Sequence, residues 1–533
     1  MTTTSTGDGE FSAVVGTYSI SDDIVIAHNV TYDDHINITG TLTVNASKTF
    51  GEGAAGKNMT VSGAVQVNGT LDLDRSSSDG NASFGSLTIG NGGTVQAPSH
   101  GNLTLTTDAT DQFLYETISG ATFSNNDGNV IITGDGKLKP RAGTGNFHNL
   151  TINASGNTID QSIALTCEGN LTITAGTLDT DSSSNFALTV TGKTTIGDAS
   201  HGSEDQATLT CNASAISLGS GKTDDYAIEM LAGGTYAGGS ANHTTGAIKQ
   251  AVANAKFTFT SATTTINSEY TSQDRMFELI AGKAYNADGR ITLTGNFTSG
   301  IQWNGPSGDT GPHTLRINDA NLTVKPRTAL IVEENFNLNA GTFNTSHDYS
   351  ANNALTVTED IHIDGTLTGN TSAISARSVH IDGTFTHNGV LTVTGIAATN
   401  YAFQNLGTWT PATSQRTTFT GGAGTFHVKS NDWNAVTIVA NNSANYYFRP
   451  KTGTGITWTA YITVTTGSMY QNDNGDSWVV EGNVLVSDDN LGLSTATGDL
   501  TFKSLTIASG ARFNATSGTT TITSTSSNYS INN

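Results

Sequence analysis

The stretch Leu188-Thr189-Val190-Thr191-Gly192 decides the fold of this chain, because phrases like it return at intervals near twenty residues. The phrase Leu165-Thr166-Cys167 begins 23 residues before it, and Leu209-Thr210-Cys211 begins 21 residues after it. A unit this short cannot enclose a hydrophobic core of its own, so it must stack on copies of itself. The spacing therefore predicts a solenoid.

Threonine alternates with leucine, isoleucine or valine inside these phrases. A period of two predicts strands that turn threonine outward and aliphatic side chains into a narrow core. The clearest tandem pair is His362-Ile363-Asp364-Gly365-Thr366 and His380-Ile381-Asp382-Gly383-Thr384, 18 residues apart and punctuated by Asp-Gly turn signals. We therefore predict an all-β chain that forms a parallel β-helix (β-solenoid) with coils of about 18–23 residues, small caps and a lateral insertion.

The regularity of the repeat divides the chain into five predicted regions. Residues 1–35 lack tandem spacing and are expected to cap the stack or attach it to something else. The β-helix is expected over 36–220 and again over 291–400, and 401–533 is expected to form a C-terminal β domain richer in aromatics. Between them, 221–290 is predicted to be an irregular insertion, with a short helix from Ser272 to Ala281 ended by Gly282 and a second from Ala247 to Lys256.

Composition excludes several classes of function. The 533 residues carry a formal net charge of −22, and only 13% of them are charged. The excess of acidic residues repels phosphate backbones and anionic membranes, so neither nucleic acid nor membrane insertion is expected. The first 30 residues contain no basic and apolar leader pattern. Either a signal has been removed or the protein assembles inside the producing cell, and the starting methionine favours the second.

Two cysteines are too few for a disulfide framework. If Cys167, Val190 and Cys211 occupy equivalent places in successive coils, the two sulfur atoms are about 9–10 Å apart. That separation exceeds what a disulfide allows. We therefore predict two free, buried thiols with Val190 between them.

The Leu-Thr-Val-Thr-Gly and His-Ile-Asp-Gly-Thr phrases resemble those of the Thr/Gly/Asn-rich parallel β-helices of phage virion proteins, which include tail spikes, fibres and head decorations, especially of marine phages. They are similar, less closely, to secreted filamentous-haemagglutinin-like adhesins. The likeness covers most of 36–400 and part of 500–525, and it is one of composition and period. It implies a homo-oligomer, expected to be a trimer, that assembles with other virion proteins on the virion surface and is extracellular after release.

One candidate metal site follows from the tandem pair. His362 and Asp364 lie on the same strand face, and His380 and Asp382 repeat the arrangement one coil later. Two imidazoles and two carboxylates on one outer patch are able to hold a divalent metal. Repeat duplication alone also leaves such stacked residues, so both interpretations stay open.

Oxygen-rich turns leave Ca²⁺ or another divalent ion open as a cofactor, and no other cofactor is expected. The stretch from Gln471 to Asp476 resembles the front of a calcium loop, although Glu481 comes too early to complete it. The pairs Asp22-Asp23, Asp33-Asp34, Asp224-Asp225 and Asp488-Asp489 alternate faces on a strand and are interpreted as solvated turn charges.

Aromatic residues become more frequent after about residue 400 and supply the candidate ligand-binding positions. Exposed rings stack on sugar faces and anchor interfaces. The positions chosen on this basis are Trp433, Tyr446, Tyr447 and Trp458. The alternative is that these rings fill the core of a wider terminal domain.

We expect a noncatalytic structural protein of a phage particle, a fibre, spike or capsid decoration that presents a rigid solenoid and contacts host surface glycans. No catalytic residues are assigned, because the many aspartates offer carboxylate pairs by accident and none stands out. Two alternatives remain: a secreted bacterial or archaeal cell-surface adhesin, and a β-helix polysaccharide depolymerase.

Overall fold

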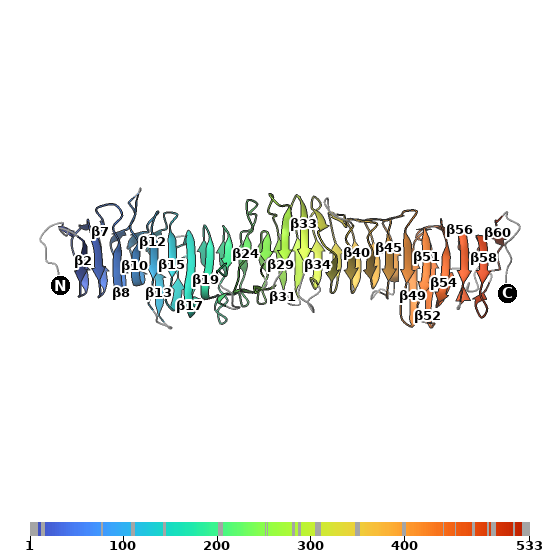
Figure 1. Cartoon of the computed structure of the whole chain (residues 1–533), viewed down its shortest axis with the longest axis horizontal. Coiled ribbons are helices and arrows are strands. Elements are labelled where there is room, and N and C mark those ends of the chain that lie inside the picture. Colours follow the sequence, from blue (N-terminus) through green and yellow to red (C-terminus); the bar gives the residue numbers. More distant parts are fainter. Residues whose placement is uncertain are drawn as a thin grey trace. The chain divides into compact units, whose positions relative to one another are not determined.

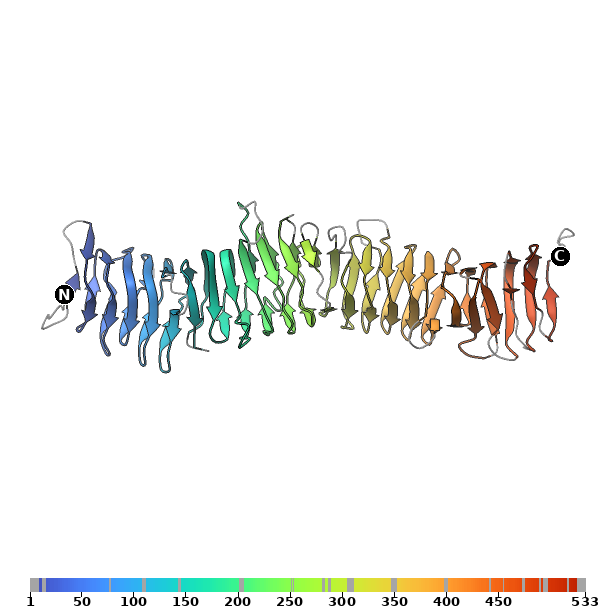
Figure 2. The same cartoon turned by 90° about the horizontal axis from the view of Figure 1, so that it is seen from below.

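The computed structural model describes residues 9–11, 16–75, 78–107, 112–141, 145–200, 206–250, 252, 254–279, 283–285, 289–303, 311–346, 352–396, 401–440, 442–453, 455–471, 475–487, 490–491, 497–514 and 517–524. The chain divides into two compact units, Met1–Gly289 and Arg290–Asn533. Each unit is a stack of short parallel strands, in which every turn of the chain lies beside the turn before it (Figure 1, Figure 2). About 20 turns are present in all, and the described residues contain no helix. The predicted parallel β-solenoid is confirmed.

Two columns of strands and one large sheet build the first unit. The first column contains β1 (Gly9–Phe11), β4 (Val30–Tyr32), β7 (Thr49–Glu52), β9 (Thr70–Asp72), β11 (Thr94–Gln96) and β14 (Thr122–Ser124). A second, which starts further along the chain, contains β18 (Leu165–Cys167), β20 (Leu188–Val190), β23 (Ile216–Leu218), β26 (His243–Thr245) and β29 (Thr263–Ile266).

The remaining strands of this unit belong to one large parallel sheet that runs its whole length. They are β2 (Thr17–Ile20), β3 (Ile24–Ile26), β5 (His35–Ile38), β6 (Leu42–Val44), β8 (Met59–Val67), β10 (Ala82–Ile89), β12 (Asn102–Leu105), β13 (Phe113–Thr117), β15 (Asn129–Ile132), β16 (Gly136–Lys139), β17 (Asn149–Gln161), β19 (Leu171–Asp179), β21 (Thr194–Ile196), β22 (Ala207–Thr210), β24 (Ile228–Met230), β25 (Gly234–Ala237), β27 (Ile248–Gln250), β28 (Lys256–Thr258), β30 (Arg275–Leu279) and β31 (Lys283–Tyr285).

The second unit has three main columns, each named here after one strand. The β40 column contains β32 (Arg290–Leu293), β34 (Thr314–Ile317), β37 (Phe336–Leu338), β40 (Asp360–Ile363), β43 (Ser378–Ile381), β46 (Tyr401–Asn405), β49 (Gly424–Lys429), β52 (Ala444–Arg449), β55 (Ser468–Gln471), β57 (Asn490–Leu491) and β59 (Arg512–Phe513). The β41 column contains β33 (Thr298–Trp303), β35 (Thr323–Pro326), β38 (Thr342–Asn344), β41 (Thr366–Asn370), β44 (Thr384–His387) and β47 (Thr408–Pro411).

The β42 column completes each turn of the second unit. It contains β36 (Leu330–Val332), β39 (Leu355–Val357), β42 (Ile374–Ala376), β45 (Val390–Val393), β48 (Arg416–Phe419), β51 (Ala435–Val439), β54 (Ile462–Thr466), β56 (Ser477–Val486), β58 (Leu500–Ile507) and β60 (Thr520–Ile522), with β50 (Asp432–Trp433) and β53 (Gly455–Trp458) joined to β56. Alternate side chains of these strands are buried, as the period of two predicted.

The solenoid begins earlier than the sequence indicated. β2 pairs with β5, and β3 pairs with β6, so residues 17–35 already form part of a coil. Ile24 and Ile26 point into the core as the later aliphatic residues do. The expected boundary at residue 35 therefore does not separate a cap from the stack. The repeat was hidden here because Thr17–Ile20 and Ile24–Ile26 do not carry the Leu-Thr-Val type of phrase found in the later strands.

The predicted coil register is right for one pair of turns and wrong for the next. Cys167 lies beside Val190 as expected, but Val190 lies beside Leu218 and not beside Cys211. Cys211 directly follows β22, which belongs to a different sheet and pairs with β19 and β25. All strands of a turn share the same alternation, so a matching phrase reveals a strand but not its place in the turn. Both thiols are nevertheless buried and free, as predicted.

The predicted helices in 221–290 are wrong, because the chain continues as strands there. Ile248 of β27 pairs with Phe277 of β30, and Lys256 of β28 pairs with Lys283 of β31. The open edge of the preceding turn offers a full row of backbone hydrogen bonds, which outweighs a weak local helix preference. Gly282, the expected end of the helix, lies outside the described residues.

The aromatic-rich part of the chain continues the same solenoid with a larger core. Trp433 lies beside Trp458 in neighbouring turns, and Trp458 contacts Trp478 with ring centroids 5.1 Å apart. Phe403 and Phe448 also contact Trp433. Residues after 400 therefore form further turns and not a separate type of domain. No helix long and apolar enough to cross a bilayer is found within the described part of the chain.

Glycines line one corner of the second unit, between the β40 and β41 columns. A Cβ atom on Gly383 would lie 2.2 Å from the carbonyl oxygen of Gly365 and 2.3 Å from that of Asp364. Gly365 meets Gly341 in the same way, and Gly407 meets Gly383. The corner therefore requires glycine because successive backbones touch there.

Replacing Gly383 by Ala is expected to lower the free energy of unfolding by about 1–3 kcal/mol, since the methyl group must push two turns apart. Denaturant unfolding followed by circular dichroism measures the change. Gly422→Ala is the matched control, because nothing lies within 4 Å of the Cβ position at Gly422. Equal stability of the two variants would contradict the close approach at the corner.

The two thiols are expected to be unreactive in the native protein. Burial raises the pKa of Cys167 and of Cys211 to about 12, so the reactive thiolate is scarce near neutral pH. A colorimetric thiol reagent at pH 8 should label neither cysteine until denaturant is added, and both thereafter. Rapid labelling of either one in the folded chain would show that its turn is open.

Candidate functional site

The tandem repeat places two histidines one above the other on the outer face of the second unit. β40 and β43 pair in parallel with His362 beside His380, and with Ile361 beside Val379. The alternation turns the aliphatic residues into the core and the histidines outward. Because both rings leave equivalent backbone positions, they stack with centroids 4.7 Å apart and planes only 9° from parallel.

Two aspartates complete a chain of polar contacts along these rings. Asp364 and Asp382 follow their strands, and each approaches the histidine of its own turn: His362 Nε2 lies 3.0 Å from Asp364 Oδ1, and His380 Nε2 lies 2.8 Å from Asp382 Oδ2. Asp382 Oδ2 also lies 3.4 Å from His362 Nε2. The order Asp364, His362, Asp382, His380 therefore links two successive turns. We call these four residues the His–Asp cluster.

The cluster is open to solvent on one side. The side chains of His362, Asp364 and Asp382 are 40%, 42% and 39% exposed, whereas His380 is 25% exposed. Small molecules and ions thus reach it without any movement of the fold.

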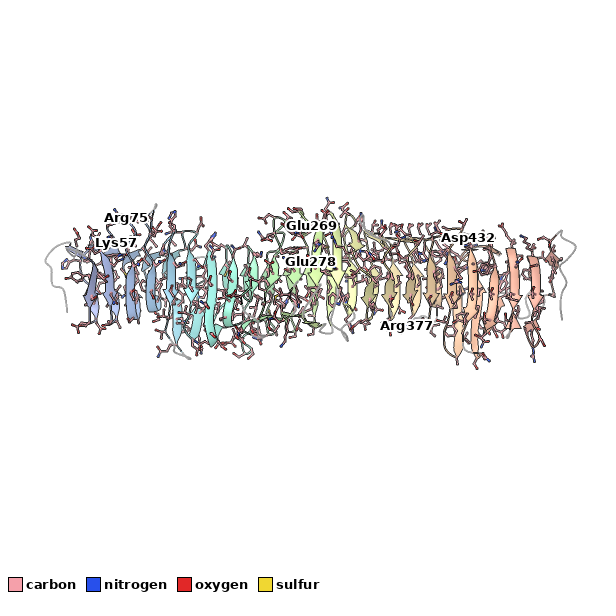
Figure 3. All side chains as sticks on the ribbon, viewed as in Figure 1. Lys57, Arg75, Glu269, Glu278, Arg377 and Asp432 are labelled. Carbon is pink, nitrogen blue, oxygen red and sulfur yellow. The ribbon has the colours of Figure 1, made fainter. Side chains whose placement is uncertain are left out.

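Neighbouring residues in the β40 column confine the cluster to two turns. Asn337 lies beside His362 on one side, and Gln404 lies beside His380 on the other. Asp360 is near but already engaged, because Arg377, labelled in Figure 3, donates to it from Nε at 3.0 Å and from Nη2 at 2.8 Å. This pairing with Asp360 raises the pKa of Arg377.

The sequence predicted a metal site at these four residues, and the 18-residue offset does bring their side chains together. Within the described residues, the ligand atoms of His362, His380 and Asp382 all lie within 4.8 Å of one another. Whether a metal binds there stays a prediction at this point, because the same contacts also serve as hydrogen bonds.

The aromatic candidates prove to be of two kinds. Trp433, Tyr446 and Trp458 are buried in the core, which corrects the expectation that they are exposed. The Tyr446 hydroxyl accepts a hydrogen bond from the backbone N–H of Gly421, and burial raises the pKa of Tyr446 to about 12. These three rings pack between turns and do not face a ligand at the surface.

Tyr447 points outward and belongs to a row of rings that the sequence analysis missed. Tyr401, His427, Tyr447 and Tyr470 occupy successive turns of the β40 column. Tyr447 and Tyr470 stack with centroids 5.0 Å apart, and Arg449 covers the ring of Tyr401 at 4.7 Å. The ring faces are thus used in contacts between turns. Unequal spacing of these residues in the sequence concealed the row.

A hollow of about 490 Å³ lies at the loops of the aromatic turns, lined by residues that include Asn405, Trp409, Asp432 and Lys451. Asp432 is labelled in Figure 3. Asn431 fixes one rim, since its Oδ1 accepts hydrogen bonds from the backbone N–H groups of Lys451 and Thr452. Asp432 and Lys451 place a carboxylate and an ammonium group around the hollow, whereas Trp409 is buried and packs on Phe385 and Phe403. The hollow therefore suits a polar ligand.

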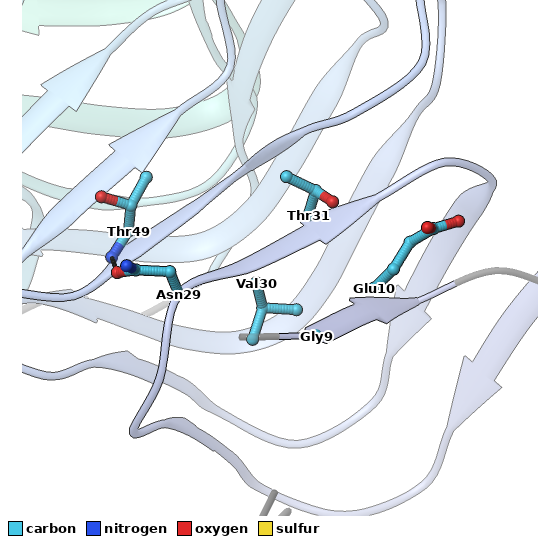
Figure 4. Close-up of a pocket in the computed structure, with 6 residues that line it drawn as sticks. All are labelled: Gly9, Glu10, Asn29, Val30, Thr31 and Thr49. Carbon is cyan, nitrogen blue, oxygen red and sulfur yellow. Dashed lines mark hydrogen bonds between the residues drawn. The ribbon is translucent and has the colours of Figure 1, made fainter. Parts of the chain in front are cut away.

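A second hollow, of about 390 Å³, lies at the start of the first unit between β1, β4 and β7 (Figure 4). Its polar groups include Glu10 and Asn29, and Asn29 Oδ1 accepts a hydrogen bond from the backbone N–H of Thr49 at 3.0 Å. Backbone and short side chains make up most of its wall. This hollow offers no convergence of functional groups comparable with the His–Asp cluster.

One group of carboxylates in the first unit consists of Glu52, Asp72 and Asp79. The pKa of Glu52 is raised by burial, and so is that of Asp72. Glu52 Oε1 accepts a hydrogen bond from the backbone N–H of Lys57 at 2.6 Å, and Oε2 accepts one from that of Gly80 at 3.5 Å. The Glu52 carboxylate therefore ties two loops to the core; Lys57 is labelled in Figure 3.

The aspartate turns proposed as solvated charges are partly explained by local bonding. Asp23 Oδ1 accepts hydrogen bonds from the backbone N–H and hydroxyl of Thr41, which lowers the pKa of Asp23. Asp224 pairs with Lys222 at 2.6 Å. Most of the calcium-like loop after Gln471, and the pair Asp488-Asp489, lie outside the described residues.

Comparisons of the chain with protein families, with curated proteins and with solved structures find no match.

The core and surface rings should differ in what they contribute to stability. Trp433→Ala is expected to cost about 3–5 kcal/mol because it leaves a large cavity. Tyr447→Ala should cost about 1 kcal/mol, since the half-exposed ring loses little beyond its stacking partners. Unfolding in urea compares the two. A larger loss for Tyr447 than for Trp433 would contradict this placement of the rings.

Proposed function

We propose that this chain is a noncatalytic structural protein of a virus particle, a fibre, spike or capsid decoration. The observation that carries the structural role is the continuous parallel pairing of turns within each unit. In the second unit, for example, Leu355, Ile374 and Leu391 stack on one another inside the core. Such a stack resists bending, because any bend must stretch backbone hydrogen bonds in one column or compress side chains in another.

The placement on a virus particle rests on the resemblance of the repeat phrases to those of phage β-helices. The chain composition supports it, since a surface of threonine, serine and asparagine with few charges stays hydrated over a wide range of salt. In this role the chain assembles as a homo-oligomer, a trimer by the same resemblance, and contacts other virion proteins.

Contact with host glycans is the second part of the proposal, and the hollow beside Trp409 is its location. Its volume of about 490 Å³ lies within the range of small-molecule sites, roughly 300–1,000 Å³. The side chains of Thr408, Asp432 and Lys451 at this hollow offer hydrogen-bonding groups to the hydroxyls of a sugar.

The alternative of a depolymerase would draw on a group of carboxylates such as the one around Glu52. A glycosidase needs one carboxyl group that donates a proton to the substrate and another that stays ionised. The oxygens of Glu52 are directed at backbone N–H groups of its own loops. This bonding supports a structural role for Glu52.

Immunogold electron microscopy tests the proposed location. An antibody raised against the purified chain should label the surface of particles released by lysis of the producing culture. Label on the cell envelope, and none on particles, would favour the adhesin instead. In a parallel assay the chain should leave the viscosity of capsular polysaccharide unchanged, and a steady fall in viscosity would contradict the noncatalytic role.

A further inference from the structure

We propose that the His–Asp cluster binds one divalent transition-metal ion of the zinc class, which fastens two successive turns of the second unit together. His362, His380 and Asp382 are the ligands, and Asp364 either completes the set or orients His362. The proposal concerns these residues alone and does not depend on where the protein acts.

The contact distances fit a common ion. Ligand atoms held roughly 2.0–2.1 Å from a metal lie about 2.9–3.4 Å from their neighbours in tetrahedral or octahedral geometry. The contacts of His362 with Asp364, of His380 with Asp382 and of His362 with Asp382 measure 3.0, 2.8 and 3.4 Å. Two of these contacts lie in that range and the third is slightly shorter, and Asp382 Oδ2 is shared by both imidazoles. These separations are therefore close to those that a single ion requires.

The two imidazoles are the part of the site that must adjust. The ligand atoms of the three residues lie within 4.8 Å of one another, and the largest separation that one ion spans is about 4.1 Å, for ligands on opposite sides. A small rotation of exposed rings supplies the difference. The paired backbones of β40 and β43 stay in place, because Ile363 and Ile381 anchor them in the core.

The donor set selects the kind of ion. Imidazole nitrogen suits Zn²⁺, Ni²⁺, Cu²⁺ and Fe²⁺, whereas Ca²⁺ and Mg²⁺ prefer oxygen ligands throughout. Two nitrogens and one or two carboxylate oxygens therefore favour the first group. The side chains are a quarter to two-fifths exposed, so water fills the remaining coordination positions.

The cluster is not a general feature of the repeat. Asparagine and glutamine take the place of histidine in the turns on either side, at Asn337 and Gln404. The position equivalent to Asp382 in the next turn is Leu406, whose backbone N–H binds the Ile381 carbonyl as that of Asp382 binds the Ile363 carbonyl. Histidine and aspartate therefore occur together in two successive turns of the β40 column and not in the turn on either side.

The test uses the full chain after removal of metals with a chelator. Isothermal titration with zinc chloride should show tight binding of one zinc ion per chain, and zinc should raise the melting temperature. The double variant His362→Gln with His380→Gln should lose this binding. Asp364→Asn should lower the zinc affinity by about 10–100-fold, as loss of an orienting carboxylate does. Calcium and magnesium chloride should give no comparable signal.

His427→Gln is the matched control. His427 is also an outward histidine of the β40 column, but its ring packs between Tyr401 and Tyr447. This variant should bind zinc as the native chain does. Zinc binding that survives in the double variant would place the ion elsewhere, and no binding by the native chain would leave the cluster as hydrogen bonds only. Either result overturns the proposal, and neither bears on the structural role.

Discussion

The backbone hydrogen bonds between successive turns are the constraint on which the rest of the structure depends. Each turn satisfies one edge of the turn before it and exposes a new edge in its place. No turn has a core of its own, so the stability of each one is shared with its neighbours. This dependence explains why a chain with a hydrophobic content of only 35% folds: the core is narrow, and its aliphatic and aromatic residues are stacked in columns.

Much of this arrangement could be predicted from the sequence, because the period of two survives in almost every strand. What failed was the assignment of phrases to positions within a turn. Leu209-Thr210-Cys211 reads like Leu188-Thr189-Val190, yet the two lie in different sheets. The helix expected from Ser272 onward failed for another reason. Its short local pattern did not include the long-range pairing of Phe277 with Ile248 that decides the conformation.

The candidate sites show the same division between local and long-range information. His362, Asp364, His380 and Asp382 were predictable as a group, because one offset of 18 residues relates both pairs and the pairing is strictly in register. The exposure of the aromatic residues could not be predicted, since burial depends on which side of the strand faces the core. Tyr446 and Tyr447 are neighbours in sequence, but one lies in the core and the other on the surface. Composition alone could not separate them.

The glycine corner of the second unit has a consequence for how the chain tolerates changes in length. Gly341, Gly365, Gly383 and Gly407 follow one another at unequal intervals, yet all meet at the same corner. The difference in length between turns is therefore taken up away from this corner. The corner acts as a fixed reference line for turns of different length. Residues inserted away from it would lengthen one turn without disturbing the alignment of its neighbours.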